Sequence, residues 1–228
     1  MDDAGTMFNC RLKGLFRTKG IMTTNPIAVG DIVDVTISED EQTGVISKIH
    51  HRKNYLIRKS TKLSKATQII AANIDQVVII VSLIKPRTST GFIDRILSTS
   101  EAYHIPSVII FNKFDLYDDK TISSLESLKK TYEKIGYKCL ITSVPEKLRL
   151  TQFKAILKGK ISLLSGHSGV GKSALINSID SSLSLRTGEI SDYHSKGIHT
   201  TTFANMFRLK FSGFVIDTPR IKEFGLVE

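Results

Sequence analysis

The stretch Gly166-His167-Ser168-Gly169-Val170-Gly171-Lys172-Ser173 decides the fold, because it fits the phosphate-binding spacing G-x-x-x-x-G-K-[ST] and follows the apolar run 161–164. Its glycines allow a tight turn in which successive backbone N–H groups converge on a polyphosphate. We expect Lys172 to reach the outer phosphates and Ser173 to face a magnesium ion. Ala174 continues into a helix whose N-terminal dipole favours anions. The alternative is a glycine-rich turn without a ligand.

A second motif indicates the base of the nucleotide. Asn112-Lys113-Phe114-Asp115 follows the β-branched run 108–111, which is typical of a strand buried on both faces. The Asp115 carboxylate can accept two hydrogen bonds from adjacent N–H donors of guanine, a pair that adenine lacks. We expect Asn112 to tie this base loop to the phosphate loop, and the Lys113 stem to lie over the base. The alternative is an ordinary exit from a strand, where Asn and Asp are common.

These two motifs occur in an unusual order, since the phosphate loop comes first in ordinary GTP-binding domains. The domain therefore reads as circularly permuted. Ser143, after a strand predicted at 138–141, is expected to contact the base from behind. Thr201 is expected to supply a hydroxyl to the magnesium ion. Asp217, at the end of an apolar strand, is expected to hold that ion through water.

The rest of the chain predicts two domains. From residue 75 onward, apolar strands alternate with helical patterns, which indicates an α/β fold with a parallel sheet and its ligand site at the carboxyl ends of the strands. We predict a strand at 77–81, a helix at 92–103 and a core-packing helical stripe from Ile122 to Ile135.

The first part of the chain instead shows short alternating runs separated by turn residues, which indicate a small closed β-barrel. We predict this barrel at 1–65 and the nucleotide domain at 66–228. Residues 60–72 are expected to form an extended connection between them.

The charge of the chain points to a polyanionic partner. The formal net charge is +10 and the pI is about 9.6, which favours RNA. Residues 48–65 contain no acid, and Tyr55 among the cations can stack on a base. The cations of this run are Lys48, Arg52, Lys53, Arg58, Lys59, Lys62 and Lys65. The alternative is a solvated basic face that serves solubility only.

Two further features of the composition bear on location and covalent structure. Cys10 and Cys139 are isolated and lack C-x-x-C spacing, so neither a disulfide nor a zinc site is indicated. No apolar run approaches the ~20 residues that span a bilayer, and no basic and apolar leader opens the chain. We expect a cytoplasmic monomer without membrane contact.

Beyond these motifs, the chain resembles a known family, the bacterial ribosome small-subunit-dependent GTPases of the RsgA or YjeQ type. The similarity covers nearly the whole chain and is carried by Asn25 to Asp31, Ile70 to Gln76, Gly166 to Ser173 and Lys196 to Thr202. It implies a circularly permuted GTPase domain preceded by an OB-type barrel. It also implies hydrolysis of GTP to GDP and phosphate, stimulation by the small ribosomal subunit, binding of its rRNA, and a role in its late maturation.

Two residues, Arg220 and Ile221, bear on the expected catalytic group. Ile221 stands where classical switch GTPases have a water-orienting glutamine, so we hypothesise that His199 orients the water, beside Lys172 and Thr201. A loop histidine that only packs or contacts RNA is the alternative. Arg220 replaces a glycine of the family, which restricts the backbone there.

The ends of the chain also differ from the family pattern. We expect this sequence to lack the family's first strand and its C-terminal zinc domain, so that the barrel is incomplete and docking on the subunit is lost. Zinc is expected only if that C-terminal domain exists in the native protein. Two other functions stay open: a nucleotide-dependent RNA-binding or ribosome-binding module with little hydrolysis, and a P-loop enzyme that acts on another nucleotide or phosphorylates a small molecule.

Overall fold

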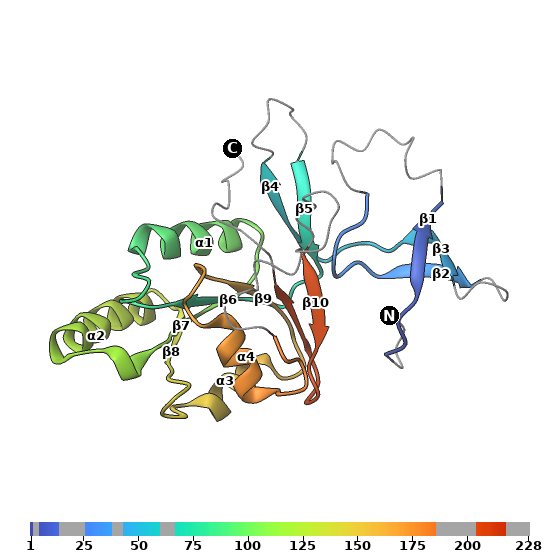
Figure 1. The fold of residues 1–228 in the computed structure, drawn as a ribbon. Coiled ribbons are helices and arrows are strands. Elements are labelled where there is room, and N and C mark those ends of the chain that lie inside the picture. Colours follow the sequence, from blue (N-terminus) through green and yellow to red (C-terminus); the bar gives the residue numbers. More distant parts are fainter. Residues whose placement is uncertain (2–4, 14–25, 38–42, 60–66, 186–203, 218–228) are drawn as a thin grey trace. The chain divides into compact units, whose positions relative to one another are not determined.

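The computed structural model describes residues 1, 5–13, 26–37, 43–59, 67–185 and 204–217 (Figure 1). The chain divides into two compact units, Met1–Asn73 and Ile74–Glu228.

Strands alone make up the regular structure described in the first unit. They are β1 (Asn9–Leu12), β2 (Val33–Ile37), β3 (Thr43–Ile49), β4 (Tyr55–Lys59) and β5 (Thr67–Ala72). In the three-stranded sheet, β3 lies between β1, to which it is parallel, and β2, to which it is antiparallel. An antiparallel pair of β4 and β5 is linked to the preceding loop by a bridge from Val29 to Ala71. The all-β content of this unit is as predicted, but its described strands form two separate sheets and not one closed barrel.

The strand β5 corrects one expectation. Residues 67–72 do not form an extended connection but pair with β4, and Ile69, Ala71 and Ala72 are buried. The sequence did not reveal this strand, because its partner is set by long-range pairing and because the run is short. As a result, the first unit extends to Asn73, beyond the boundary predicted at residue 65.

A buried ion pair holds the loop before β2. Arg52 Nε lies 2.6 Å from Asp31 Oδ1, and the side chain of Asp31 is 1% exposed. Arg52 also donates to the second oxygen of Asp31 at 2.6 Å and to the Pro26 carbonyl at 3.1 Å. The hydrogen bonds from Arg52 to Asp31 raise the pKa of the guanidinium. One cation of the basic run is therefore engaged inside the unit.

The second unit contains a six-stranded sheet in the order β10-β11-β9-β6-β7-β8. Its strands are β6 (Gln76–Val81), β7 (Ser107–Phe111), β8 (Lys138–Ile141), β9 (Ile161–Ser165), β10 (Asn205–Arg208) and β11 (Phe214–Asp217). All neighbours are parallel except β10, which is antiparallel to β11. The parallel sheet is confirmed, whereas the edge strand β10 was not predicted.

Helices cover both faces of this sheet. They are α1 (Thr90–Ala102), α2 (Asp119–Lys134), α3 (Leu150–Leu157) and α4 (Lys172–Ile179), with a short 3₁₀ helix η2 (Phe114–Leu116). Side chains of α3 and α4 join those of β6 and β7 in one hydrophobic core. Figure 1 shows α1 on the opposite side of the sheet from α3 and α4.

The helical stripe at 122–135 is only partly a core stripe. Leu125 and Tyr132 are buried, but Ile135 is 62% exposed. The prediction that Ile135 packs in the core is wrong, because it is the C-cap residue of α2 and lies beyond the last helical turn. Gly136 then adopts a φ of +99°, the left-handed conformation that favours glycine at a helix end.

Candidate nucleotide-binding site

The phosphate loop connects the end of β9 to the start of α4. Gly166 approaches the sheet so closely that a Cβ on it would lie 2.2 Å from the carbonyl oxygen of Ile80. Gly171 has a φ of +98°, and a Cβ there would lie 2.4 Å from Asn112 Nδ2. Both positions therefore need glycine for close approach as well as for backbone conformation. The loop is set by β9, which pairs with β6 in the middle of the sheet.

Lys172 lies across this loop. Its Nζ donates to the carbonyl oxygens of Gly166 at 2.7 Å and His167 at 3.0 Å. Burial lowers the pKa of Lys172, and the nearby negative charge of Asp217 opposes that shift. The ammonium group is thus held inside the curve of the loop, next to the backbone that would surround a phosphate.

His167 contacts α1, which the sequence motif did not reveal. Its ring lies 4.0 Å from that of Phe92, with 34° between the planes. Burial, followed by the positive charges of Lys172 and Arg95, lowers the pKa of His167. The neutral form of the ring is therefore favoured, and the ring packs against Phe92 of α1.

The other residues of the phosphate loop differ in which of their groups can contact a ligand. Ser168 and Gly169 are exposed, whereas Val170 is fully buried in the core. Only the backbone of Val170 can therefore face a ligand. Ala174 is partly buried in the first turn of α4.

Asn112 joins the base loop to the phosphate loop. Its Nδ2 donates to the carbonyl oxygen of Val170 at 2.9 Å, and its Oδ1 accepts from Thr142 Oγ1 at 3.0 Å. Its backbone N–H donates to Val81 at 2.8 Å, and the residue is 2% exposed. The contact expected between the two loops is present, although their motifs lie more than fifty residues apart in the sequence.

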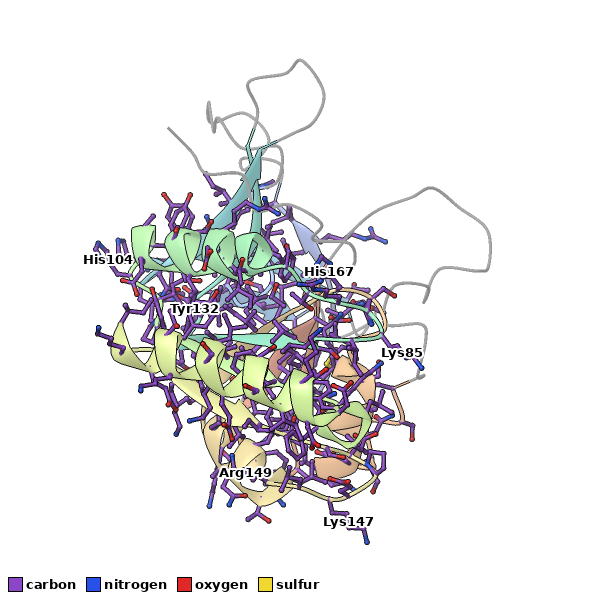
Figure 2. All side chains as sticks on the ribbon, turned by 90° about the vertical axis from the view of Figure 1, so that its left-hand side faces the viewer. Lys85, His104, Tyr132, Lys147, Arg149 and His167 are labelled. Carbon is purple, nitrogen blue, oxygen red and sulfur yellow. The ribbon has the colours of Figure 1, made fainter. Side chains whose placement is uncertain are left out.

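Asp115 and Lys113 lie just beyond this anchor. Lys113 has a φ of 66° and precedes η2, which carries Asp115. Ser143 Oγ donates to Asp115 Oδ1 at 2.7 Å, so the two residues expected to read the base are brought together. Lys113 Nζ donates to the carbonyl oxygen of Lys85 at 2.6 Å. Figure 2 shows Lys85 and His167 toward the same end of the unit, away from His104.

Two of the expected magnesium residues lie at the same edge of the sheet. Ser173 and Asp217 are 6% and 5% exposed. Asp217 is paired in register with Leu164 of β9, next to the start of the phosphate loop. Hydroxyl and carboxylate oxygens are ligands that Mg²⁺ accepts, so these residues fit that ion. In the part of the chain that the structure describes, no group of three or more His, Cys, Asp or Glu forms a metal cluster.

The remaining predicted residues, Thr201 and His199, lie outside the described residues, as do Arg220 and Ile221. No helix among the described residues is long and apolar enough to cross a membrane.

Comparisons with known proteins decide the family. The sequence profile of the RsgA GTPase matches residues 49–227, and that of the RsgA N-terminal domain matches residues 1–46. The chain belongs to the RsgA GTPase family. This RsgA-family chain is 51% identical over 228 residues to the small ribosomal subunit biogenesis GTPase RsgA of Flavobacterium johnsoniae. The match covers 99% of this chain and 70% of that relative. The protein of the same name from Porphyromonas gingivalis is 46% identical, over 98% of the chain and 72% of the relative.

Solved structures of RsgA relatives show the same fold. YjeQ from Thermotoga maritima superimposes with a TM-score of 0.71 at 34% identity, over 95% of this chain and 68% of that one. YloQ, described as a circularly permuted GTPase, gives a TM-score of 0.66 at 27% identity, over 99% of this chain and 67% of that one. The family and the circularly permuted α/β fold with its N-terminal β domain, both expected from the sequence, are confirmed.

Proposed function

We propose that this RsgA-family protein hydrolyses GTP to GDP and phosphate and acts in the biogenesis of the small ribosomal subunit, as the names of its relatives describe for them. The hydrogen bond between Asn112 Nδ2 and the Val170 carbonyl is the observation that carries the nucleotide part of this proposal. It joins the loop that carries Asp115 to the phosphate loop, so one nucleotide can span both.

Guanine recognition is assigned to the base loop. The Asp115 carboxylate accepts hydrogen bonds from the base, and Ser143 orients the carboxylate through the 2.7 Å contact. Lys113 covers the base with its aliphatic stem. Adenine lacks the adjacent pair of N–H donors that guanine presents, so binding of an adenine nucleotide would leave the Asp115 carboxylate unsatisfied. The affinity for adenine nucleotides is therefore much lower than that for guanine nucleotides.

Binding of the phosphates is assigned to the backbone of residues 166–174 and to Lys172. Hydrolysis builds negative charge on the transferring oxygens, so cations and N–H donors at the loop stabilise the transition state. Ser173, Thr201 and Asp217 would hold Mg²⁺, which when bound neutralises phosphate charge. His199 is the residue that we propose orients the attacking water.

The first unit is assigned to rRNA. An OB-type domain with cations on exposed strands suits an RNA backbone, and Lys48 is exposed on β3. Arg52 is excluded from this role because it is engaged with Asp31. The protein acts as a monomer in the cytoplasm, and zinc enters only with the family's C-terminal domain.

Phosphate release measured with small subunits, large subunits or neither tests this function. We expect small subunits to raise GTP turnover, large subunits to leave it at the basal rate, and ATP to be a poor substrate in every arm. GTP binding without turnover in any arm would instead support a nucleotide-dependent RNA-binding module. Equal turnover of ATP and GTP would contradict the guanine assignment.

A further inference from the structure

The hydroxyl of Tyr117 lies in a hydrogen-bonded group that neither nucleotide motif predicts. It donates to the carbonyl oxygen of Asn112 at 2.8 Å and accepts from the N–H of Leu83 at 2.9 Å. Ser82 Oγ lies 3.4 Å away. The ring is 9% exposed and packs edge-on against Phe114, with 6.0 Å between centroids. A polar group with this burial and these partners fixes its neighbours.

The partners of Tyr117 come from two neighbouring strands. Asn112 follows β7, and Leu83 belongs to residues 82–86, which we call the post-β6 segment. Because β6 and β7 are parallel neighbours, both segments leave the same edge of the sheet. The same two segments meet again where Lys113 Nζ donates to the Lys85 carbonyl. The base loop is therefore tied to the post-β6 segment at two points.

The position of Asp115 depends on both ends of the base loop. Asn112 fixes the first end through its side chain and backbone. The turn of η2 follows, and the backbone N–H of Tyr117 donates to Phe114 at 3.0 Å. The hydroxyl of Tyr117 then returns to Asn112 and closes the loop. Without that contact, the turn that carries Asp115 keeps the Ser143 hydroxyl and the Phe114 N–H bond to the Thr142 carbonyl, but its C-terminal end is no longer tied to Asn112.

We propose that Tyr117 is a positioning residue for guanine recognition, which closes the base loop onto Asn112 and the post-β6 segment and so holds Asp115 in the geometry that reads the base. This inference rests on the proposed function. It concerns only how the acid is held, because the partners of the Tyr117 hydroxyl are protein groups of the base loop and the post-β6 segment.

The chemical state of Tyr117 agrees with this role. Burial is the main cause that raises the pKa of its hydroxyl, and the negative charge of Asp115 acts in the same direction. The hydroxyl therefore stays protonated at neutral pH and keeps its proton for the Asn112 carbonyl.

Tyr132 provides a matched control. Its hydroxyl donates to Asp94 Oδ1 at 2.8 Å, and the residue is 4% exposed. This hydrogen bond joins α2 to α1 and involves neither loop. Figure 2 shows Tyr132 between these helices, apart from Lys85 and His167. Changing either tyrosine to phenylalanine removes one buried hydroxyl, but only Tyr117→Phe changes the base loop.

The test compares dissociation constants for GDP and IDP in the full chain, with a fluorescent GDP analogue as the displaced probe. IDP lacks the exocyclic amine of guanine, so the GDP to IDP ratio reports on how well Asp115 is placed. We expect Tyr117→Phe to weaken GDP binding about tenfold, since a buried carbonyl and a buried N–H lose their partner. IDP binding should weaken less, so the ratio falls. Tyr132→Phe should lower the melting temperature and leave both constants unchanged.

The possible outcomes separate this inference from the function on which it rests. A wild-type protein that shows no preference for GDP over IDP would overturn both. A wild-type preference that Tyr117→Phe retains in full would overturn only the role of Tyr117. Equal losses of the ratio in Tyr117→Phe and Tyr132→Phe would overturn it as well, because they would indicate a general effect of stability.

Hydrogen exchange in the wild-type protein keeps the inference testable if Tyr117→Phe does not fold. We expect GDP to slow exchange of the Leu83 amide by more than it slows exchange in the middle of α2. Leu83 lies outside both nucleotide motifs, so protection there reports tightening of the Tyr117 contact. An unchanged Leu83 amide in the presence of saturating GDP would overturn the proposal.

Discussion

Substitution of Gly171 by alanine should test how tightly the two halves of the nucleotide site are joined. The added Cβ would lie 2.4 Å from Asn112 Nδ2, a separation that requires Asn112 to move. Asn112 would then lose its hydrogen bonds to the Val170 carbonyl and to Thr142 Oγ1. Each buried polar group left without a partner costs about 1–3 kcal/mol.

Gly169→Ala is the matched control. Gly169 also has a positive φ, +82°, but a Cβ there would meet nothing closer than Pro86 Cδ at 3.5 Å, which is an ordinary contact. Both variants share the cost of a left-handed alanine, about 1–2 kcal/mol, and the partly offsetting loss of freedom in the unfolded chain. The difference between them isolates the collision with Asn112. We expect Gly171→Ala to be about 2–5 kcal/mol less stable than Gly169→Ala.

Urea unfolding without nucleotide, followed by far-ultraviolet circular dichroism, measures this difference. Among the described residues, helices occur only in the second unit, so the helical signal reports on the unit that carries both glycines. Equal midpoints and slopes for the two variants would refute the reasoning, because Asn112 would then be free to move without cost.

Three further substitutions and the chemistry of Cys139 have predicted outcomes. Asp115→Asn should raise the dissociation constant for GDP a hundredfold or more and improve binding of xanthosine diphosphate, because the amide presents a donor where guanine has donors. Competition binding measures both affinities. An unchanged affinity for GDP would show that Asp115 is not part of the site. Arg52→Ala should cost about 3–5 kcal/mol of stability by removing the cationic partner of the buried Asp31 carboxylate, which keeps its hydrogen bond from the Ala28 N–H at 2.8 Å. Lys48→Ala should change stability by less than about 0.5 kcal/mol and reduce the salt dependence of RNA binding. The reverse pattern in unfolding and binding titrations would contradict these roles. Burial raises the pKa of Cys139 to about 12, so iodoacetamide at pH 8 should alkylate the exposed Cys10 first. Equal alkylation rates for Cys10 and Cys139 would be evidence against the raised pKa. The protonated Cys139 thiol should also stabilise the fold below about pH 9, and this contribution should be lost as the pH rises toward the pKa of the thiol in the folded protein.

The parts of the site that the sequence predicted are those encoded by local spacing. The phosphate loop and the base loop each require particular residues within eight positions, so strand, loop and helix follow from the chain itself. The link between Asn112 and Val170 was also predictable, because both loops follow strands of one parallel sheet.

The contacts that the sequence did not predict depend on register between distant elements. From the sequence, Tyr117 is indistinguishable from any other apolar residue near the start of a helix. Only the pairing of β6 with β7 brings its hydroxyl to Leu83. Phe92 reads as the buried face of α1, although its ring also meets His167. The strand β5 was missed for the same reason, since its partner β4 fixes it and its own composition does not.

The order of strands in the second unit has a consequence for how the protein is made. The strands β6, β7 and β8 are neighbours both along the chain and in the sheet, whereas β9 returns to pair on the far side of β6. Domains generally fold as units during translation, which adds about 5–20 residues per second, so the base loop is synthesised seconds before the phosphate loop to which Asn112 is hydrogen-bonded. A nascent chain that ends before Val170 therefore lacks the carbonyl that holds the Asn112 side chain, and the loop at 112–115 gains this anchor only when the later half of the unit has been made.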